Sequence, residues 1–195
     1  YTVELPVAEA DSGLPTPGGT GIGTATVSFF GAVRFAGNLG DGFAVSQGTS
    51  LLRIGRWPFH AVSYTAASSV FGWLEFDEEA EETDFSGTLR WVKPARAKDA
   101  LYPAGFTAQI AASGARYVDP GVTGRVLPLD EVADNGFINF SGGGLPEALG
   151  TTFTLGVGKT VAVPASLKLV VDPKTGIFSG SFFEAVGISA RTFRG

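Results

Sequence analysis

The sequence contains no cysteine and no methionine, and its only histidine is His60. Without cysteine the chain forms no disulfide, no cysteine-ligated zinc site and no thiol nucleophile. A single histidine excludes a metal site with two histidine ligands, and a Ser-His-Asp triad would have to use His60. Because the chain also lacks a G-x-S-x-G segment, we expect His60 to be a structural or surface residue.

Charged residues and long apolar runs are also scarce. Charged residues make up 17% of the 195 positions, and 14 basic against 19 acidic side chains give a net charge of −5. The densest basic segment, KPARAK at 93–98, is expected to be a solvated loop, so the chain lacks the basic face of nucleic-acid-binding proteins. No apolar run approaches the roughly 18 residues of a membrane helix. We expect neither nucleic-acid binding nor a membrane span.

Glycine is abundant: 28 positions, roughly twice its average use, without the G-X-Y period of collagen. The glycines of LGDGF (39–43), DNG (134–136) and DPKTG (172–176) predict tight turns. The first 23 residues are rich in glycine and proline towards their end, and we expect them to form an extended lead-in. A single β domain is expected over 24–195, with two halves joined near 119–135 as the alternative organisation.

Short apolar or alternating runs between turn signals predict an all-β fold with many short strands. No stretch of eleven residues has helical periodicity, and the only helix candidates are 95–101 and 146–150. Without helices for parallel crossovers, the strands should be mainly antiparallel, in a barrel-like sheet or a two-sheet sandwich. The expected strands are 25–30, 32–37, 57–64, 69–76, 85–92, 136–142, 152–157, 160–164, 167–171, 176–183 and 187–193.

A Phe-x-Gly tripeptide recurs in this pattern. It occurs at 35–37, 85–87, 140–142 and 178–180. Alternation places the phenylalanine and glycine on one strand face and the middle residue on the other. A glycine inside a strand marks a bend or the close approach of a neighbouring aromatic ring, so we interpret the repeat as a packing device that favours barrel closure. Phe85, Phe178 and Gly180 should then face the interior, and Ser86 and Ser179 should not.

An acidic run, DEEAEETD at 77–84, separates two expected strands. Clustered carboxylates suit hard cations such as calcium, but the run lacks the alternating order and the glycine of a calcium-binding loop. We interpret it as a charged hairpin loop that keeps a sheet edge soluble, and we expect no cofactor. The ligands of the alternative, a calcium site, would be Asp77, Glu78, Glu79 and Asp84.

Tryptophan and tyrosine gather between positions 57 and 117. Exposed aromatic rings on a β-sheet would suit stacking on carbohydrate, and the candidate ligand-binding residues are Trp57, Tyr64 and Tyr102. Trp91 shares the apolar face of its strand and Trp73 lies in the apolar run VFGWLEF, so both are expected in the core.

Residues 31–106 resemble a β-rich module of large secreted or surface proteins of bacteria. The resemblance rests on GNLGDG at 37–42, which has the pattern G-x-L-x-D-G, and on FSGTLRW at 85–91, which has the pattern F-S-G-x-x-x-W. A Ser/Gln-rich strand and an aromatic-Pro segment lie between them. The resemblance implies a passenger or C-terminal module of an exported protein and carries no catalytic residue set.

We therefore expect a non-enzymatic structural or adhesive module, as a subunit or fragment of a larger assembly. It would be secreted or held at the cell surface after removal of a signal peptide. Expected partners are other domains or copies of the same protein, a surface assembly, or glycans. The alternatives are a carbohydrate-binding module and a hydrolase that uses carboxylates such as Glu75 and Asp84.

Overall fold

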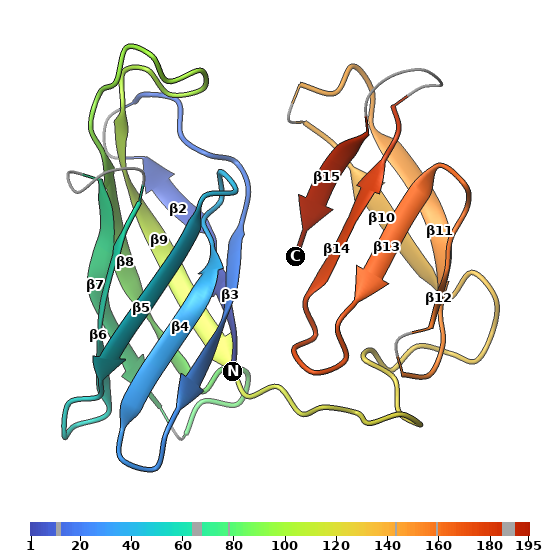
Figure 1. Ribbon diagram of the computed structural model, residues 1–195, viewed down its shortest axis with the longest axis horizontal. Helices are drawn as coiled ribbons and strands as arrows, with labels where there is room; N and C mark the ends of the chain where they lie inside the picture. The colour runs from blue at the N-terminus through green and yellow to red at the C-terminus, as the bar shows by residue number, and fades with distance from the viewer. Residues whose placement is uncertain (11–12, 64–67, 78, 143, 159, 185–189) are drawn as a thin grey trace. The chain divides into compact units, whose positions relative to one another are not determined.

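Figure 1 shows the computed structural model, which describes residues 1–10, 13–63, 68–77, 79–142, 144–158, 160–184 and 190–195. The expected all-β, antiparallel fold is confirmed: every paired strand is antiparallel, and the described residues contain no helix. The two helix candidates are therefore wrong; 95–101 is a loop, and the end of 146–150 opens a strand. The chain divides into two compact units, Tyr1–Arg116 and Tyr117–Gly195.

The first unit is a nine-stranded sheet that curls into a nearly closed barrel (Figure 1). Its order is β5-β4-β3-β1-β9-β8-β7-β6, and β2 also pairs with β9. Its strands are β1 (Thr2–Leu5), β2 (Val7–Ala10), β3 (Gly21–Val27), β4 (Ala32–Asn38), β5 (Ala44–Ser50), β6 (Arg56–Val62), β7 (Ser69–Phe76), β8 (Phe85–Lys93) and β9 (Phe106–Ala115).

A side chain helps to close the barrel where β5 meets β6. Pro58 on β6 lacks the N–H of a regular ladder, which confines proline to a strand edge. Its carbonyl accepts a hydrogen bond from Gln47 Nε2 on β5 at 2.7 Å, and Gln47 Oε1 accepts one from Trp57 Nε1 at 3.1 Å. The seam is therefore bridged by an amide side chain.

Alternate side chains fill the barrel interior, as in other small barrels. Trp57 and Phe85 are fully buried with ring centroids 5.4 Å apart, and Trp91 meets Phe106 edge to face at 4.8 Å. Small residues on β9 make room for these rings: an added Cβ at Gly114 would collide with the Phe85 ring on β8. The core is a packed arrangement of large rings over small neighbours.

Four strands of the barrel, β1, β2, β5 and β9, lie outside the expected strand ranges. Residues 1–23, expected as an extended lead-in, contain β1 and β2, and Val3 and Leu5 of β1 are fully buried. The strand β9 has alanine and glycine at several inward positions, so its hydrophobic alternation is weak. Short or small-residue strands give little periodic signal, although Val3 and Leu5 of β1 and alternate residues of β9 are buried.

The described residues of the second unit form six strands in two three-stranded antiparallel sheets. Phe140 stacks on Phe182 with ring centroids 4.1 Å apart, and Leu167 and Leu169 complete a small buried cluster. Its strands are β10 (Gly136–Phe140), β11 (Leu149–Leu155), β12 (Val161–Ala162), β13 (Leu167–Val171), β14 (Phe178–Phe182) and β15 (Arg191–Arg194).

The Phe-x-Gly interpretation holds in the barrel and partly fails in the second unit. Phe85 is buried while Ser86 is exposed, as expected. Ser179 is also exposed, and Gly180 lies beneath the ring of a neighbouring strand. Phe178, however, is 38% exposed, so its expected interior position is wrong. It begins β14, where its ring covers the backbone at the chain's last residue and not the buried cluster.

Candidate functional site

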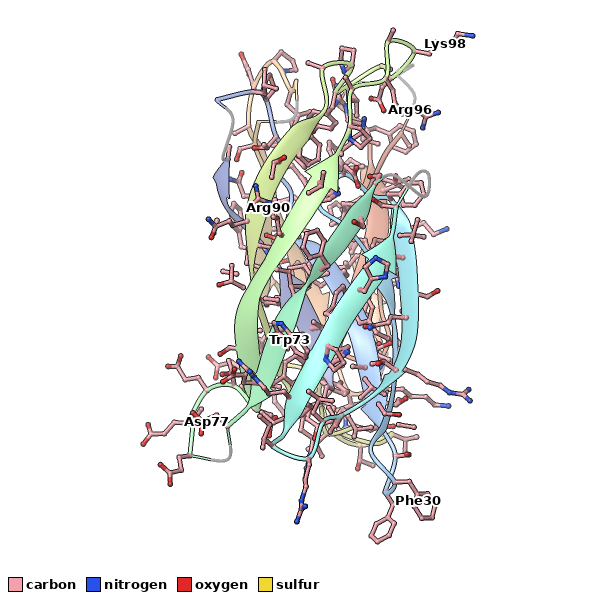
Figure 2. All side chains as sticks on the ribbon, turned by 90° about the vertical axis from the view of Figure 1, so that its left-hand side faces the viewer. Phe30, Trp73, Asp77, Arg90, Arg96 and Lys98 are labelled. Atoms are coloured by element: carbon pink, nitrogen blue, oxygen red, sulfur yellow. The ribbon has the colours of Figure 1, made fainter. Side chains whose placement is uncertain are left out.

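A turn at one end of the barrel presents two phenylalanines to solvent. Ser28 to Gly31 connect β3 to β4; the Gly31 N–H donates to the Ser28 carbonyl at 2.9 Å, and the Ala32 N–H donates to Ser28 Oγ at 3.1 Å. Gly31 has φ 79°, the left-handed conformation that such hairpin loops place on glycine. Phe29 and Phe30 are 98% and 92% exposed, with ring centroids 5.5 Å apart (Figure 2).

The next turn along this end has the same construction. In the segment 52–55, the Gly55 N–H donates to the Leu52 carbonyl at 3.0 Å, and Gly55 has φ 74°. Ile54 is 73% exposed, and Leu52 is also exposed. The two turns are joined because the Leu51 N–H donates to the Gly31 carbonyl at 2.8 Å. We call the exposed side chains Phe29, Phe30, Leu52 and Ile54 the apolar tip.

The acidic loop 77–84 lies at the same end. The Phe76 N–H donates to the Gly55 carbonyl at 3.0 Å, which places the loop beside the second turn. Figure 2 shows Asp77 at the end of the barrel that carries Phe30. The exposed carboxylates of the described loop residues are Asp77, Glu79, Glu81 and Glu82.

Three of the four candidate calcium ligands of this loop lie within the described residues. Asp77 Oδ1 accepts the Glu79 N–H at 3.0 Å, and the Asp84 carboxylate accepts the Arg116 N–H at the end of β9. Glu78 lies outside the described residues. In the part of the chain that the structure describes, no three histidine or acidic side chains form a group that could hold a metal ion.

The opposite end of the barrel carries a hollow of about 470 Å³. It lies between the β4–β5 turn and the loop 94–105, and its mouth includes Leu101, which is 70% exposed. Arg96 and Lys98 extend into solvent at this end (Figure 2). We call it the terminal hollow, and its lining residues are Asp41, Gly42, Phe43, Lys98, Asp99, Ala100, Leu101 and Tyr102.

A buried ion pair shapes the loop beside this hollow. The side chain of Lys93 is fully buried, and its Nζ lies 2.7 Å from Asp99 Oδ2 and donates to the Tyr102 carbonyl at 3.2 Å. The hydrogen bond from Lys93 lowers the pKa of Asp99 to about 2. Burial raises the pKa of Asp41. The expectation that all of 93–98 is solvated is therefore wrong for Lys93. The loop places the Asp99 carboxylate and the Tyr102 carbonyl against its ammonium group, which is buried.

A second hollow, of about 430 Å³, lies on the outer face of β7 and β8. Trp73 is 47% exposed there, and the Arg56 guanidinium lies 5.5 Å from its ring centroid. Arg56 Nε donates to Glu75 Oε1 at 2.7 Å. We call it the lateral hollow, and its lining residues are Trp73, Glu75, Phe76, Asp77, Ser86, Gly87 and Thr88.

The three aromatic residues proposed from the sequence as ligand contacts occupy different environments. Trp57 is fully buried and offers no face to a ligand, because its strand turns that side into the barrel. Tyr64 lies outside the described residues. Tyr102 is half-buried, meets Phe106 edge to face at 5.2 Å and lines the terminal hollow; burial raises its pKa. His60 is exposed on β6.

Trp73 and the apolar tip are the features that sequence reasoning missed. Trp73 was expected in the core because VFGWLEF is apolar on both faces, which hides the alternation of its strand. The phenylalanines at 29 and 30 were assigned to the strand 25–30. The signal for a turn is present in SFFG, where a serine and a glycine flank the two rings.

No family model, curated protein or solved structure matches this chain. Within the described residues, no helix is long and apolar enough to cross a membrane. Function is therefore inferred from the chain's own residues and their geometry.

Proposed function

We propose that the protein is a non-enzymatic interaction module, with a structural or adhesive role in an exported bacterial protein, and that the apolar tip is its contact surface. The observation that carries this proposal is the exposure of Phe29 and Phe30 at 98% and 92%. Leaving such side chains in water forgoes about 1.5–3 kcal/mol each, which contact with a partner would recover. Contiguous apolar groups on a soluble domain usually mark a binding surface.

The construction of the tip favours binding over simple exposure. Both turns are held by backbone hydrogen bonds and joined to each other through the Leu51 N–H and the Gly31 carbonyl. A contact surface that is already ordered loses little conformational entropy when it binds. The barrel interior is filled by side chains, so contact with a partner is made through the ends and the outer face.

The two carboxylates considered for a hydrolase are engaged in structural contacts. Glu75 accepts a hydrogen bond from Arg56 on the neighbouring strand, and Asp84 accepts one from the backbone of Arg116. Both contacts tie one strand or strand end to another. This use of the carboxylates supports the non-enzymatic proposal.

Bead adhesion tests the proposal. Beads coated with the full chain would be allowed to settle on alkyl-terminated, hydroxyl-terminated and mucin-coated surfaces, and the fraction retained under shear would be measured. The double variant Phe29→Ser/Phe30→Ser should lower retention on at least one surface about fivefold or more. The matched control is Val118→Ser/Val122→Ser, which removes two exposed apolar side chains from the second unit. Equal retention of both variants would overturn the proposal.

A carbohydrate-binding function is the second candidate, and the lateral hollow favours it. Trp73 offers an exposed ring, while Glu75, Ser86 and Thr88 offer hydrogen-bonding groups around it. An apolar surface with a few placed polar groups is the usual composition of a ligand site. On a glycan array, Trp73→Ala should abolish a signal that Phe71→Ala retains, since Phe71 is similarly exposed but does not line the hollow. A signal unchanged by Trp73→Ala would exclude this site.

A further inference from the structure

We propose that the partner of the apolar tip is a second copy of this chain, bound head to tail, with the tip of one barrel seated in the terminal hollow of the next. This inference rests on the proposed function and adds the identity of the partner. It follows from the shape and the charge of the two barrel ends, which complement each other.

The two ends match in shape and polarity. The tip is convex, since both turns extend beyond the strands they connect, and its leading groups are the rings of Phe29 and Phe30. The terminal hollow is concave, measures about 470 Å³ and includes the apolar side chains of Phe43, Leu101 and Tyr102. The hollow is open to solvent, and its volume exceeds the roughly 150 Å³ of an enclosed cavity that holds benzene, so phenyl rings can rest in it.

The charges around the two surfaces also match. The acidic loop beside the tip carries Asp77 and Glu79, and the hollow is flanked by the basic side chains of Arg96 and Lys98 (Figure 2). The Asp41 carboxylate that lines the hollow is held within its own turn, where its Oδ1 accepts the Phe43 N–H at 2.9 Å and burial raises its pKa. The other carboxylate of the hollow, Asp99, is already paired with a buried lysine. The acidic loop of one copy would therefore meet the basic side chains of the next, which favours this register.

The same charges disfavour two other arrangements. Two copies joined tip to tip would bring their acidic loops together, and like charges across an interface are costly. An anionic lipid surface would likewise be repelled by the acidic loop beside the tip. Head-to-tail contact uses different patches on the two copies. Because these patches lie at opposite ends of the barrel, we expect an open chain of barrels and not a closed dimer.

Sedimentation velocity on the full chain tests the inference. The sedimentation coefficient of the wild-type protein should rise with concentration from micromolar to millimolar. The tip variant Phe29→Ser/Phe30→Ser and the hollow variant Lys98→Glu/Leu101→Ser should each remain monomeric over that range. Val118→Ser/Val122→Ser should associate like the wild type. Circular dichroism and thermal melting would confirm that the variants are folded.

Mixing the two variants gives the decisive result. The tip variant keeps an intact hollow and the hollow variant keeps an intact tip, so an equimolar mixture should form a one-to-one dimer and nothing larger. Added salt should weaken this dimer, because part of the contact is electrostatic. A mixture that stays monomeric while the wild type associates would overturn the inference. Dimers formed by the hollow variant alone would also overturn it, because they would indicate tip-to-tip contact.

The outcomes separate this inference from the proposed function. A wild-type chain that stays monomeric at millimolar concentration, yet loses surface adhesion with Phe29→Ser/Phe30→Ser, would refute the second copy as partner and leave the interaction module in place. Co-sedimentation of a monomeric wild-type chain with zwitterionic vesicles would also refute it, by identifying a lipid surface as the occupant. A tip variant that keeps both surface adhesion and self-association would refute the proposed function and the second copy as partner.

Discussion

The two units build the same kind of strand into cores of different depth. In the barrel, β7, β8 and β9 are 8 to 10 residues long and belong to one continuous sheet, and Trp57 and Trp91 are fully buried. In the second unit the described strands have at most 7 residues and form two sheets, and the buried residues of its core cluster, Leu167, Leu169 and Phe182, retain 5–8% exposure. Both units place a phenylalanine over a glycine of the next strand, at Gly114 and at Gly180. A phenylalanine packed over a glycine is therefore common to both units. The deeper core of the barrel goes with its longer strands in a single sheet.

The largest expected contrast comes from removing a buried ring in each unit. Trp57→Ala should destabilise the barrel by about 3–5 kcal/mol, because it leaves a cavity beside Phe85. Phe182→Ala should cost the second unit less, about 2–3 kcal/mol, since its shallower core can relax around the gap. Scanning calorimetry would measure both. Each variant should lower one thermal transition only; a joint shift of both transitions would show that the units do not unfold independently.

The buried ion pair should produce the next largest effect. Asp99→Asn leaves the Lys93 ammonium buried without its carboxylate and should lower the melting temperature of the barrel by roughly 10 °C. Folding lowers the pKa of Asp99 from the usual 3.8 to about 2. The carboxylate therefore stabilises the barrel above pH 3.8, and this contribution is lost as the pH falls towards 2. Melting curves across this range should show a smaller pH dependence for the variant than for the wild type.

Glycine substitutions probe the device that the units share. Gly114→Ala should cost about 1–3 kcal/mol, because the added methyl group would displace the Phe85 ring of the neighbouring strand. Gly180→Ala should cost at least as much, because its methyl group would collide with the Lys168 backbone carbonyl as well as with the Phe193 ring. Gly48→Ala on β5 is the matched control: no atom lies within 4 Å of its added Cβ, and the change should be neutral or slightly stabilising. Urea unfolding would measure all three. A neutral Gly114→Ala would show that the Phe85 ring moves aside without cost.

The smallest expected effect is at the barrel seam, for which the second unit has no counterpart among its described residues. Gln47→Leu removes the hydrogen bonds to the Pro58 carbonyl and from Trp57 Nε1, and should cost about 1–2 kcal/mol. Hydrogen exchange should increase at the amides of β5 and β6 and remain unchanged in β8. Uniform exchange across the sheet would show that the seam does not open separately.

Local patterns predicted the bounds of two strands, and the burial of side chains where the two strand faces differ. The boundaries of 69–76 and 167–171 agree with β7 and β13, and the alternation of FSGTLRW correctly separates buried Phe85 from exposed Ser86. The sequence also places Trp57 on the same strand face as Phe59 and Ala61, and all three are buried. Successive side chains of a strand point to opposite faces, so the sequence alone is sufficient for these assignments.

Local patterns did not predict which tryptophan would be exposed. Trp57 was proposed as a ligand contact and is buried, whereas Trp73 was expected in the core and lies outward at 47% exposure. In VFGWLEF both faces of the strand are apolar, so alternation alone does not select the inner one. The choice follows from the partner strands, which turn Leu74 inward and therefore Trp73 outward.

The sequence by itself determined the all-β class, several turns, and the strand faces wherever apolar and polar residues alternate, because these features depend on residues close together in the chain. Only the tertiary structure decided the barrel. Its closure needs Val3 on β1 to pair with Gly114 on β9, more than a hundred positions away. The same long-range pairing brings the two apolar turns and the acidic loop to one end and the terminal hollow to the other, which no local pattern encodes.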